Sequence, residues 1–493
     1  MNNIIVLPVL VPLLTAITLV FFRRYIHLQR SISVLALIIT SGISIYVLEK
    51  IQVHGVLRLD FGGWKPPYGI LFVADSFAML LVAVGSFVAA ICLMFAFGSI
   101  GRDLESKYFY SFSLFLVAGV NGSFLTGDLF NLFVCFEVLL VASYVLLFIA
   151  GGKSQLTASI TYITVNVISS WFFLVSIGFL YGTVGTLNMA HLSERIAEAG
   201  QTPLLTTISL LFLLVFGIKA GLLLYIWLPD SYSVLPPAIA ALFGALLTKV
   251  GIYAVFRFFT LLFYHEPQVT HKLIGILAVI TIVGGCLGSI AYHSIQKVIV
   301  YNVVIAVGFI FLALAVSTEA ALQGAIYYLM HDMIVKALLF MIGGMVVIAT
   351  GTTRMEKMSG LIGNYPLLGV LYFITMLSLA GIPPFSGFIG KFLIGEGAIE
   401  NGSYVLLAFA FLSSLLVLYS LVRVFLSCFW GETIIGEDEK VKLPASLYIP
   451  SVILTIGTIA LGLGAEIFTS YVTAATDVLM NPKIYIEAVL NRN

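Results

Sequence analysis

Long apolar runs separated by short polar segments fill most of the chain. The runs at 3–22, 273–292 and 298–317 contain no charged residue, and about 20 apolar residues are enough for a helix to cross the hydrocarbon core of a bilayer. We therefore expect an all-α polytopic membrane protein. Fourteen spans are predicted, at about 3–22, 31–49, 71–98, 108–127, 130–150, 157–182, 204–228, 236–261, 273–292, 298–317, 319–350, 365–396, 402–430 and 447–473.

Five ionisable residues interrupt these apolar runs. Lys219, Lys249, Lys336 and Lys391 each lie inside a predicted span, and Glu137 lies near the middle of the fifth. One charged side chain at the bilayer centre costs roughly 2.5–3.5 kcal/mol on insertion scales. Such residues therefore face one another or water inside a bundle, where they mark ion pathways and proton relays. We expect these five residues to belong to a proton path.

Some of these residues also have simpler interpretations. Lys219 can serve only to neutralise Glu137, and Lys249 can reach the membrane interface with its long side chain. Lys336 follows Asp332 by four residues, the favourable order for an intrahelical ion pair, and such a pair can be purely structural.

Other titratable residues lie within or beside the spans. His331 is the only histidine well inside a predicted span, and because imidazole titrates near neutral pH, we expect it to take part in a proton relay. Asp75 and Asp128 lie at predicted span ends, where a carboxylate commonly caps a helix.

Two predicted spans contain helix-breaking residues. Pro383 and Pro384 lie in the twelfth span, shortly before Lys391, and consecutive prolines interrupt a helix. Gly221 follows Lys219 in the seventh span and allows that helix to loosen. Broken helices at membrane depth occur where they are buried in protein or line a cavity, and their ends offer dipoles to ions in transporters. Both breaks therefore indicate a transport site.

One order of ionisable groups within the predicted spans, a polar centre followed by lysine, occurs twice along the chain. Spans four to eight carry Glu137, Lys219 and Lys249, and spans nine to thirteen carry Lys336, with its neighbouring histidine, and Lys391. An offset of five spans places the two halves in opposite orientations, which is an inverted repeat. The predicted divisions are an N-terminal three-helix segment at 1–107, a first five-helix repeat at 108–261, a second at 262–430, and a C-terminal loop, last span and tail at 431–493.

Only short segments are polar enough to lie outside the membrane. Residues 50–70 predict a hairpin because of their Gly-Gly and Pro-Pro pairs. Residues 187–202 predict a short interfacial helix, and residues 431–443 a charged loop. Loops after odd-numbered spans hold eleven lysines and arginines. Those after even-numbered spans hold six when Arg257, near the end of the eighth span, is counted with them. The positive-inside rule then predicts that the odd loops are cytoplasmic and that both termini are extracellular.

Composition narrows the function further. The chain is 61% hydrophobic and 10% charged, whereas soluble domains are about 25% charged. A net charge of +1 gives no electrostatic basis for binding nucleic acid. The four cysteines are scattered through apolar runs without metal-ligand spacing. Because no Gly-rich phosphate loop, haem motif or iron–sulfur motif occurs, we expect neither a cofactor nor a bound metal, and any redox chemistry would occur in another chain.

Several stretches together are similar to one known membrane family. They are TGDLFNLFVCFEVLLVASYVLL, KAGLLLYIWLPDSYSVLPPAIAALFGALLTKVGIYAVFRF, HSIQKVIVYNVVIAVGFI, HDMIVKALLF and LAGIPPFSGFIGKF. The family is the proton-translocating one shared by the membrane arm of respiratory complex I and by multisubunit Mrp-type cation/proton antiporters. The compact length and the N-terminal MNNIIVLPVLVPLLTA resemble the Mrp branch, as does the absence of a proline directly after Lys219.

The resemblance implies a function and a role for each matching residue. Glu137 and Lys219 match the family's interacting pair, Lys249 and Lys336 its central axis, and Lys391 the exit of its second half-channel. His331 matches the axis histidine. The resemblance also implies export of sodium at the expense of the proton gradient across a bacterial plasma membrane. The implied partners are the other subunits of a hetero-oligomeric antiporter, including a larger homologous antiporter-like subunit.

Two other functions remain possible at this point. A proton-pumping subunit of complex I would use the same residues but would be driven by quinone reduction. A standalone channel or solute carrier of unrelated fold would need a central cluster of substrate-specific polar groups, and the sequence shows none beyond the charged axis.

Overall fold

The structure is a computed structural model and describes residues 2–200, 202–434, 436 and 440–490. Within these residues, thirteen helices are long and apolar enough to cross a membrane. Helices dominate because the bilayer core contains no water, so each spanning segment must satisfy its own backbone hydrogen bonds. The prediction of an all-α polytopic membrane protein is therefore confirmed.

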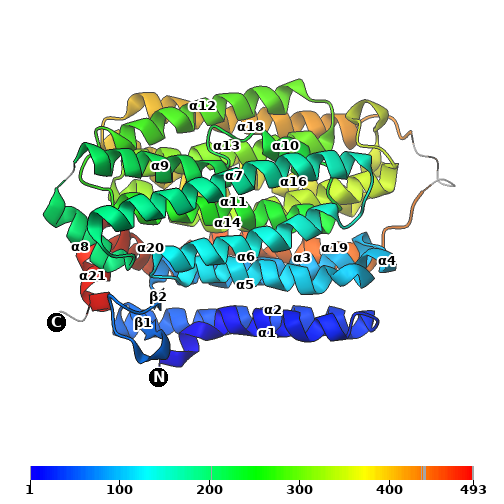
Figure 1. Ribbon diagram of the computed structural model, residues 1–493. Helices are drawn as coiled ribbons and strands as arrows, with labels where there is room; N and C mark the ends of the chain where they lie inside the picture. The colour runs from blue at the N-terminus through cyan, green and yellow to red at the C-terminus, as the bar shows by residue number, and fades with distance from the viewer. Residues whose placement is uncertain (1, 201, 435, 437–439, 491–493) are drawn as a thin grey trace.

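The bundle is built from the thirteen long helices and three shorter ones, α16, α17 and α20 (Figure 1). In chain order they are α1 (Leu7–Phe21), α2 (Ile26–His54), α3 (Ser76–Ser99), α5 (Tyr110–Leu125), α6 (Leu129–Phe148), α7 (Lys153–Val184), α9 (Pro203–Ala220), α11 (Pro237–Leu261), α12 (Thr270–Ala291), α13 (Ile295–Val316), α14 (Glu319–Thr350), α16 (Pro366–Ala380), α17 (Ser386–Glu400), α18 (Tyr404–Cys428), α19 (Ala445–Leu463) and α20 (Ala465–Met480).

Helices α11, α13 and α14 are among the most buried of the bundle. Their most apolar stretches are 100%, 89% and 83% buried, whereas those of α1 and α18 are each only 28% buried. Figure 1 shows α1 and α2 along one flank and α12 and α18 along the opposite one. Two of these three helices, α11 and α14, carry Lys249 and Lys336, so these charges lie deep inside the protein.

Both predicted helix breaks are present. The seventh span stops with α9 at Ala220 and resumes as the short α10 (Trp227–Tyr232), and the twelfth is divided into α16 and α17. Each first half ends on a glycine in the left-handed region, Gly221 with φ 82° and Gly381 with φ 83°. Glycine adopts this conformation without the steric cost that a Cβ imposes.

The two breaks share one backbone hydrogen-bond pattern. Leu222 N–H donates to the Gly217 carbonyl at 2.8 Å, and Ile382 N–H donates to the Leu377 carbonyl at 3.1 Å. Each is the long bond of a Schellman motif, which satisfies carbonyls at a helix end. Because Pro383 and Pro384 come directly after the second motif, that helix cannot continue without interruption.

Some predicted boundaries were wrong. The third span was expected from residue 71, but Leu71–Ala74 forms strand β2, and α3 begins at Ser76. The last span was expected to be continuous over 447–473, but it ends at Leu463 and the chain turns at Gly464 into α20. An apolar run has the same hydrophobicity in a strand or a helix, so the run alone does not separate them.

The short segments outside the long helices follow the predictions more closely. β1 (Leu57–Asp60) pairs antiparallel with β2 in a hairpin, but β2 lies beyond the predicted segment 50–70 and residues 50–54 belong to α2. The short helix expected at 187–202 is α8 (Met189–Ala199). Residues 435 and 437–439 of the predicted charged loop lie outside the described residues. The remaining short elements are η1 (Asn2–Val6), η2 (Phe61–Gly63), α4 (Arg102–Leu104), η3 (Glu105–Phe109), η4 (Met355–Lys357), α15 (Leu361–Asn364) and α21 (Pro482–Leu490).

Two loop pairings recur with an offset of five spans. The loop before α6 pairs with the loop after α7 through an antiparallel bridge between Asp128 and Asn188. Likewise, the loop before α13 pairs with the loop after α14 through a bridge between Ser294 and Arg354. This recurrence supports the predicted inverted repeat, which stays a prediction.

Candidate functional site

Glu137 and Lys219 are joined through a serine. The Ser170 hydroxyl on α7 donates to Glu137 Oε1 on α6 at 2.5 Å, and Lys219 Nζ on α9 donates to Ser170 Oγ at 3.1 Å. Lys219 is buried and its ammonium lies 5.2 Å from the centre of the Phe136 ring. A favourable cation–π contact of this kind helps to hold a charge away from water.

Glu137 also borders a groove at the edge of the bundle. It is half-buried, and the groove is lined mostly by apolar side chains, among them Leu13 of α1 and Phe112 of α5. The Glu137 carboxylate therefore contacts Ser170 on one side and the apolar groove on the other.

The end of α9, which carries Lys219, packs against α11, the helix that carries Lys249. A Cβ added to Gly251 on α11 would lie only 2.5 Å from the backbone nitrogen of Ala220. The glycine thus lets α11 and the end of α9 pack backbone to backbone, which brings together the two helix segments that carry the lysines.

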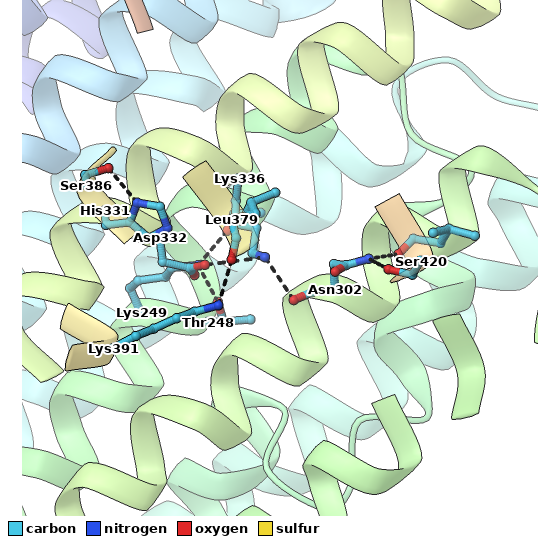
Figure 2. Close-up of polar contacts among 12 residues, drawn as sticks. Thr248, Lys249, Asn302, His331, Asp332, Lys336, Leu379, Ser386, Lys391 and Ser420 are labelled. Atoms are coloured by element: carbon cyan, nitrogen blue, oxygen red, sulfur yellow. Dashed lines mark hydrogen bonds and ion pairs between the residues drawn. The ribbon is translucent and has the colours of Figure 1, made fainter. Parts of the chain in front are cut away.

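Lys249, Asp332 and Lys336 form the centre of the site, which we call the central triad (Figure 2). Lys249 Nζ lies 2.6 Å from Asp332 Oδ2, and Lys336 Nζ lies 3.5 Å from Asp332 Oδ1. All three side chains are at most 1% exposed. Asp332 therefore bridges two helices, α11 and α14, instead of pairing only within its own helix.

The central triad has an unbalanced charge when every member is ionised. Two ammonium groups share one carboxylate, and isolated buried charge is energetically costly. In that state the triad carries one net positive charge within the bundle. Oxygen acceptors at short range hold the lysines: Lys249 donates to the Gly244 carbonyl at 2.8 Å and Lys336 to the Asn302 carbonyl at 2.9 Å.

A polar connection continues from Lys336 into α18. The Asn302 side-chain amide donates to Ser420 Oγ at 3.3 Å, as Figure 2 shows. Both side chains are buried. No pattern in the sequence indicated this connection, because single asparagine and serine residues are ordinary within helices.

His331 faces away from the triad, towards the second helix break. Its Nδ1 lies 2.7 Å from Oγ of Ser386, the first residue of α17. A Cβ added to Gly387 would lie 3.0 Å from His331 Cε1. The imidazole is therefore packed directly against the start of α17, shortly before Lys391.

Lys391 binds the end of the other half-helix. Its ammonium donates to the Leu379 carbonyl at 2.8 Å and to the Ala380 carbonyl at 3.0 Å. These are the last carbonyls of α16, where the helix dipole favours a cation. Lys391 is half-buried and lines a pocket that also includes Phe309 and Glu396.

Asp75 and Asp128 cap helices, as predicted. Asp75 Oδ1 accepts a bond from the Ala78 amide and Asp128 Oδ1 from the Asn131 amide, both at 2.8 Å. Asp75 Oδ2 also lies 2.5 Å from an Arg257 nitrogen, in a buried ion pair between α3 and α11. The sequence suggested no partner for Asp75, because the two residues lie far apart along the chain.

The chain matches one family over most of its central region. Residues 126–417 match the transmembrane family described as NADH:quinone oxidoreductase/Mrp antiporter. The chain belongs to this family.

Relatives of the same length support this membership. The chain is 48% identical to the D subunit of the Na(+)/H(+) antiporter of Bacillus subtilis strain 168, over 99% of this chain and 100% of that protein. It is 45% identical to the protein of the same name from Alkalihalophilus pseudofirmus, with the same coverage. A chain in the structure of the Mrp complex from Dietzia sp. DQ12-45-1b superposes with a TM-score of 0.93 at 29% identity, over 99% of this chain and 100% of that one.

Proposed function

We propose that this chain is the proton-translocating D subunit of a multisubunit Na⁺/H⁺ antiporter of the Mrp type. It carries protons into the cell while sodium leaves, and it acts as a secondary transporter rather than an enzyme. The observation that carries the proposal is a series of titratable groups from Glu137 and Lys219 through the central triad to Lys391, buried at its centre and half-buried at Glu137 and Lys391. Full-length similarity to antiporter subunits of that name supports it.

The proposed setting is a bacterial plasma membrane. The partners are the other subunits of a hetero-oligomeric complex, including a larger homologous antiporter-like subunit, together with membrane lipid, Na⁺ and H⁺. No nucleic acid takes part. The proton gradient drives the export of sodium, and each proton that enters in excess of the sodium ions that leave gains about 2.3 kcal/mol for each 100 mV of membrane potential.

The proposed mechanism starts at the serine-bridged pair. When the bridge through Ser170 is closed, the Lys219 ammonium helps to keep Glu137 ionised. When Lys219 moves away, Glu137 takes up a proton, and Lys219 brings its charge closer to Lys249. Like charges repel, so a proton then leaves the central triad towards His331 and Lys391.

The test is transport by variants of the intact complex. The genes would be expressed together in a host that lacks its own antiporters, and sodium-dependent dissipation of ΔpH would be measured in everted vesicles. Glu137→Ala, Lys219→Ala and Lys391→Ala should each abolish the signal at normal protein levels. Lys272→Ala is the control, because Lys272 is exposed at the start of α12. Normal transport by the three variants would overturn the proposal.

A proton-pumping subunit of complex I is the second candidate. It is favoured by the family description, which names NADH:quinone oxidoreductase beside the antiporter. In that case the same residues would move protons outward when NADH is oxidised. Pumping driven by NADH and blocked by a quinone-site inhibitor, in vesicles whose sodium response is absent, would select this candidate instead.

A further inference from the structure

A cluster of buried hydroxyl groups lies where α14, α19 and the broken helix meet. Ser378 of α16, Ser386 of α17 and Thr458 of α19 form this hydroxyl cluster, and all three are fully buried. Thr458 Oγ1 lies 2.6 Å from Ser378 Oγ and 2.8 Å from Ser386 Oγ, and the two serines lie 3.5 Å apart. The two contacts of Thr458 are within the ordinary range for hydrogen bonds between hydroxyls, and the serine–serine contact is longer.

The hydroxyl cluster connects two groups of the proposed proton path. Ser386 Oγ lies 2.7 Å from His331 Nδ1. At the other side of the cluster, Ser378 directly precedes Leu379 and Ala380, whose carbonyls bind the Lys391 ammonium. The cluster therefore contacts the histidine directly and includes the residue that precedes the two carbonyls bound by Lys391.

Two glycines make this convergence possible. A Cβ added to Gly387 would lie 2.0 Å from the Ser378 carbonyl oxygen, and one added to Gly462 on α19 would lie 2.1 Å from the Pro384 carbonyl oxygen. Any larger residue would force these backbones apart. The fold thus brings α16, α17 and α19 into direct backbone contact around the hydroxyls.

Thr458 differs from the other buried hydroxyls of its helix. The Thr455 hydroxyl donates to the Ser451 carbonyl at 2.8 Å, and the Ser451 hydroxyl donates to the Leu447 carbonyl at 2.9 Å. Such bonds to the carbonyl four residues earlier satisfy a hydroxyl inside its own helix. The Thr458 hydroxyl instead joins two serines from the broken span.

We propose that the hydroxyl cluster is a proton relay between His331 and the Lys391 site. This inference rests on the proposed function and assigns new residues to it. A hydroxyl donates one hydrogen bond while it accepts others, so each can receive a proton from one neighbour as it gives its own to the next.

The transfer balances without leaving charge on any hydroxyl. His331 takes a proton at Nε2 and gives the one on Nδ1 to Ser386, which passes its own proton to Thr458. Thr458 passes its proton to Ser378. Lys391 first gives up one proton to the pocket that it lines, and the neutral amine that remains then takes up the proton that Ser378 releases. Rotation of the three hydroxyls and return of the imidazole proton to Nδ1 reset the chain for the next transfer.

The test compares two threonines of α19 in the intact antiporter complex. Thr458→Val keeps the shape of the side chain but removes the hydroxyl. It should lower the rate of sodium-dependent proton movement by at least about tenfold. This threshold is set lower than the roughly 100-fold or larger loss that usually follows removal of a positioned proton-transfer group. Thr458→Ser should restore at least about half of the rate, because it returns the hydroxyl. Thr455→Val is the matched control and should stay within about twofold of the unmodified rate, because Thr455 bonds only its own helix.

The outcomes separate the relay from the function. Unmodified transport by Thr458→Val, in an experiment in which Lys391→Ala is inactive, would overturn the relay and leave the proposed function intact. If both Thr458→Val and Lys391→Ala transport at the unmodified rate, both the relay and the proposed function would be overturned. A Thr458→Ser variant as inactive as Thr458→Val, at normal protein levels, would overturn the relay because the defect would then follow side-chain volume. If Thr458→Val does not accumulate, Ser378→Ala decides the question by the same criteria.

Discussion

Asp332 is the only carboxylate of the central triad, and it lies between two lysines from different helices. Its sequence spacing from Lys336 suggested a pair within one helix, yet the shorter contact is the 2.6 Å one to Lys249. Removing one partner of a buried ion pair typically costs about 3–5 kcal/mol. Substitutions within the central triad are therefore informative only when the charge that remains is balanced.

Ser170 provides a test at the residue scale that leaves both charged groups in place. Ser170→Ala would break the connection between Glu137 and Lys219, and we expect it to slow sodium-dependent proton movement by about tenfold or more, because the two charges are then no longer held together. Ser169→Ala is the matched control: the neighbouring Ser169 is also buried, but it donates to the Val215 carbonyl instead.

The comparison is made by vesicle transport at equal subunit levels. Equal rates for the two serine variants would contradict the role given to Ser170.

The residues of the site were predictable to different degrees. Each predicted lysine, together with Glu137 and His331, stood out because ionisable groups are rare in apolar runs. The residues that connect them did not. Ser170 and Asn302 are common types within helices, and their contacts come from segments far apart along the chain. Only the packing of the helices brings these groups together.

At the element scale, the break between α16 and α17 determines where Lys391 lies. Gly381 has a positive φ, and a Cβ added there would lie 2.7 Å from Lys391 Cδ. Gly381→Ala should therefore displace the lysine from the α16 carbonyls, besides adding a strain of roughly 1–2 kcal/mol in the left-handed region. We expect loss of most transport activity, measured in everted vesicles.

Gly402 supplies the control for backbone strain alone. It also has a positive φ, of 67°, but a Cβ added there meets nothing within 4 Å. Gly402→Ala should lower the thermal stability of the complex to a similar extent and leave transport nearly unchanged. Similar activity in the two glycine variants would argue against a role for the geometry of the break.

The elements themselves were largely predictable from hydrophobic runs, prolines and glycines. The breaks were predictable because glycine and two consecutive prolines have strong local effects on a helix. Strand β2 and the division at Gly464 were not. Strand β2 forms because Leu71–Ala74 pairs with β1, which lies earlier in the chain. The last span ends at Leu463 because the chain turns at Gly464 before α20 begins.

At the scale of the whole molecule, both termini lie at the same end of the bundle (Figure 1). The distribution of basic residues predicts that this end is extracellular. Lys483 is exposed in α21, and Lys153 is exposed at the start of α7, after an odd-numbered span.

Labelling of single cysteines tests this orientation. We expect a membrane-impermeant maleimide added to intact cells to label Lys483→Cys, and to label Lys153→Cys only after permeabilisation. The natural cysteines are buried or half-buried, so the unmodified chain gives the background. The reverse pattern of labelling would contradict the predicted orientation.

The most direct test of proton passage through the bundle centre is proton movement by a Lys249→Met variant of the assembled complex. This change removes one of the two lysines and leaves Asp332 paired with Lys336, so the remaining buried pair is neutral when both of its members are ionised. We predict that sodium-dependent proton movement in everted vesicles falls to the background of the antiporter-deficient host, while the protein accumulates and assembles normally. Transport at the unmodified rate would contradict the claim that protons pass through the buried ionisable groups at the centre of this bundle.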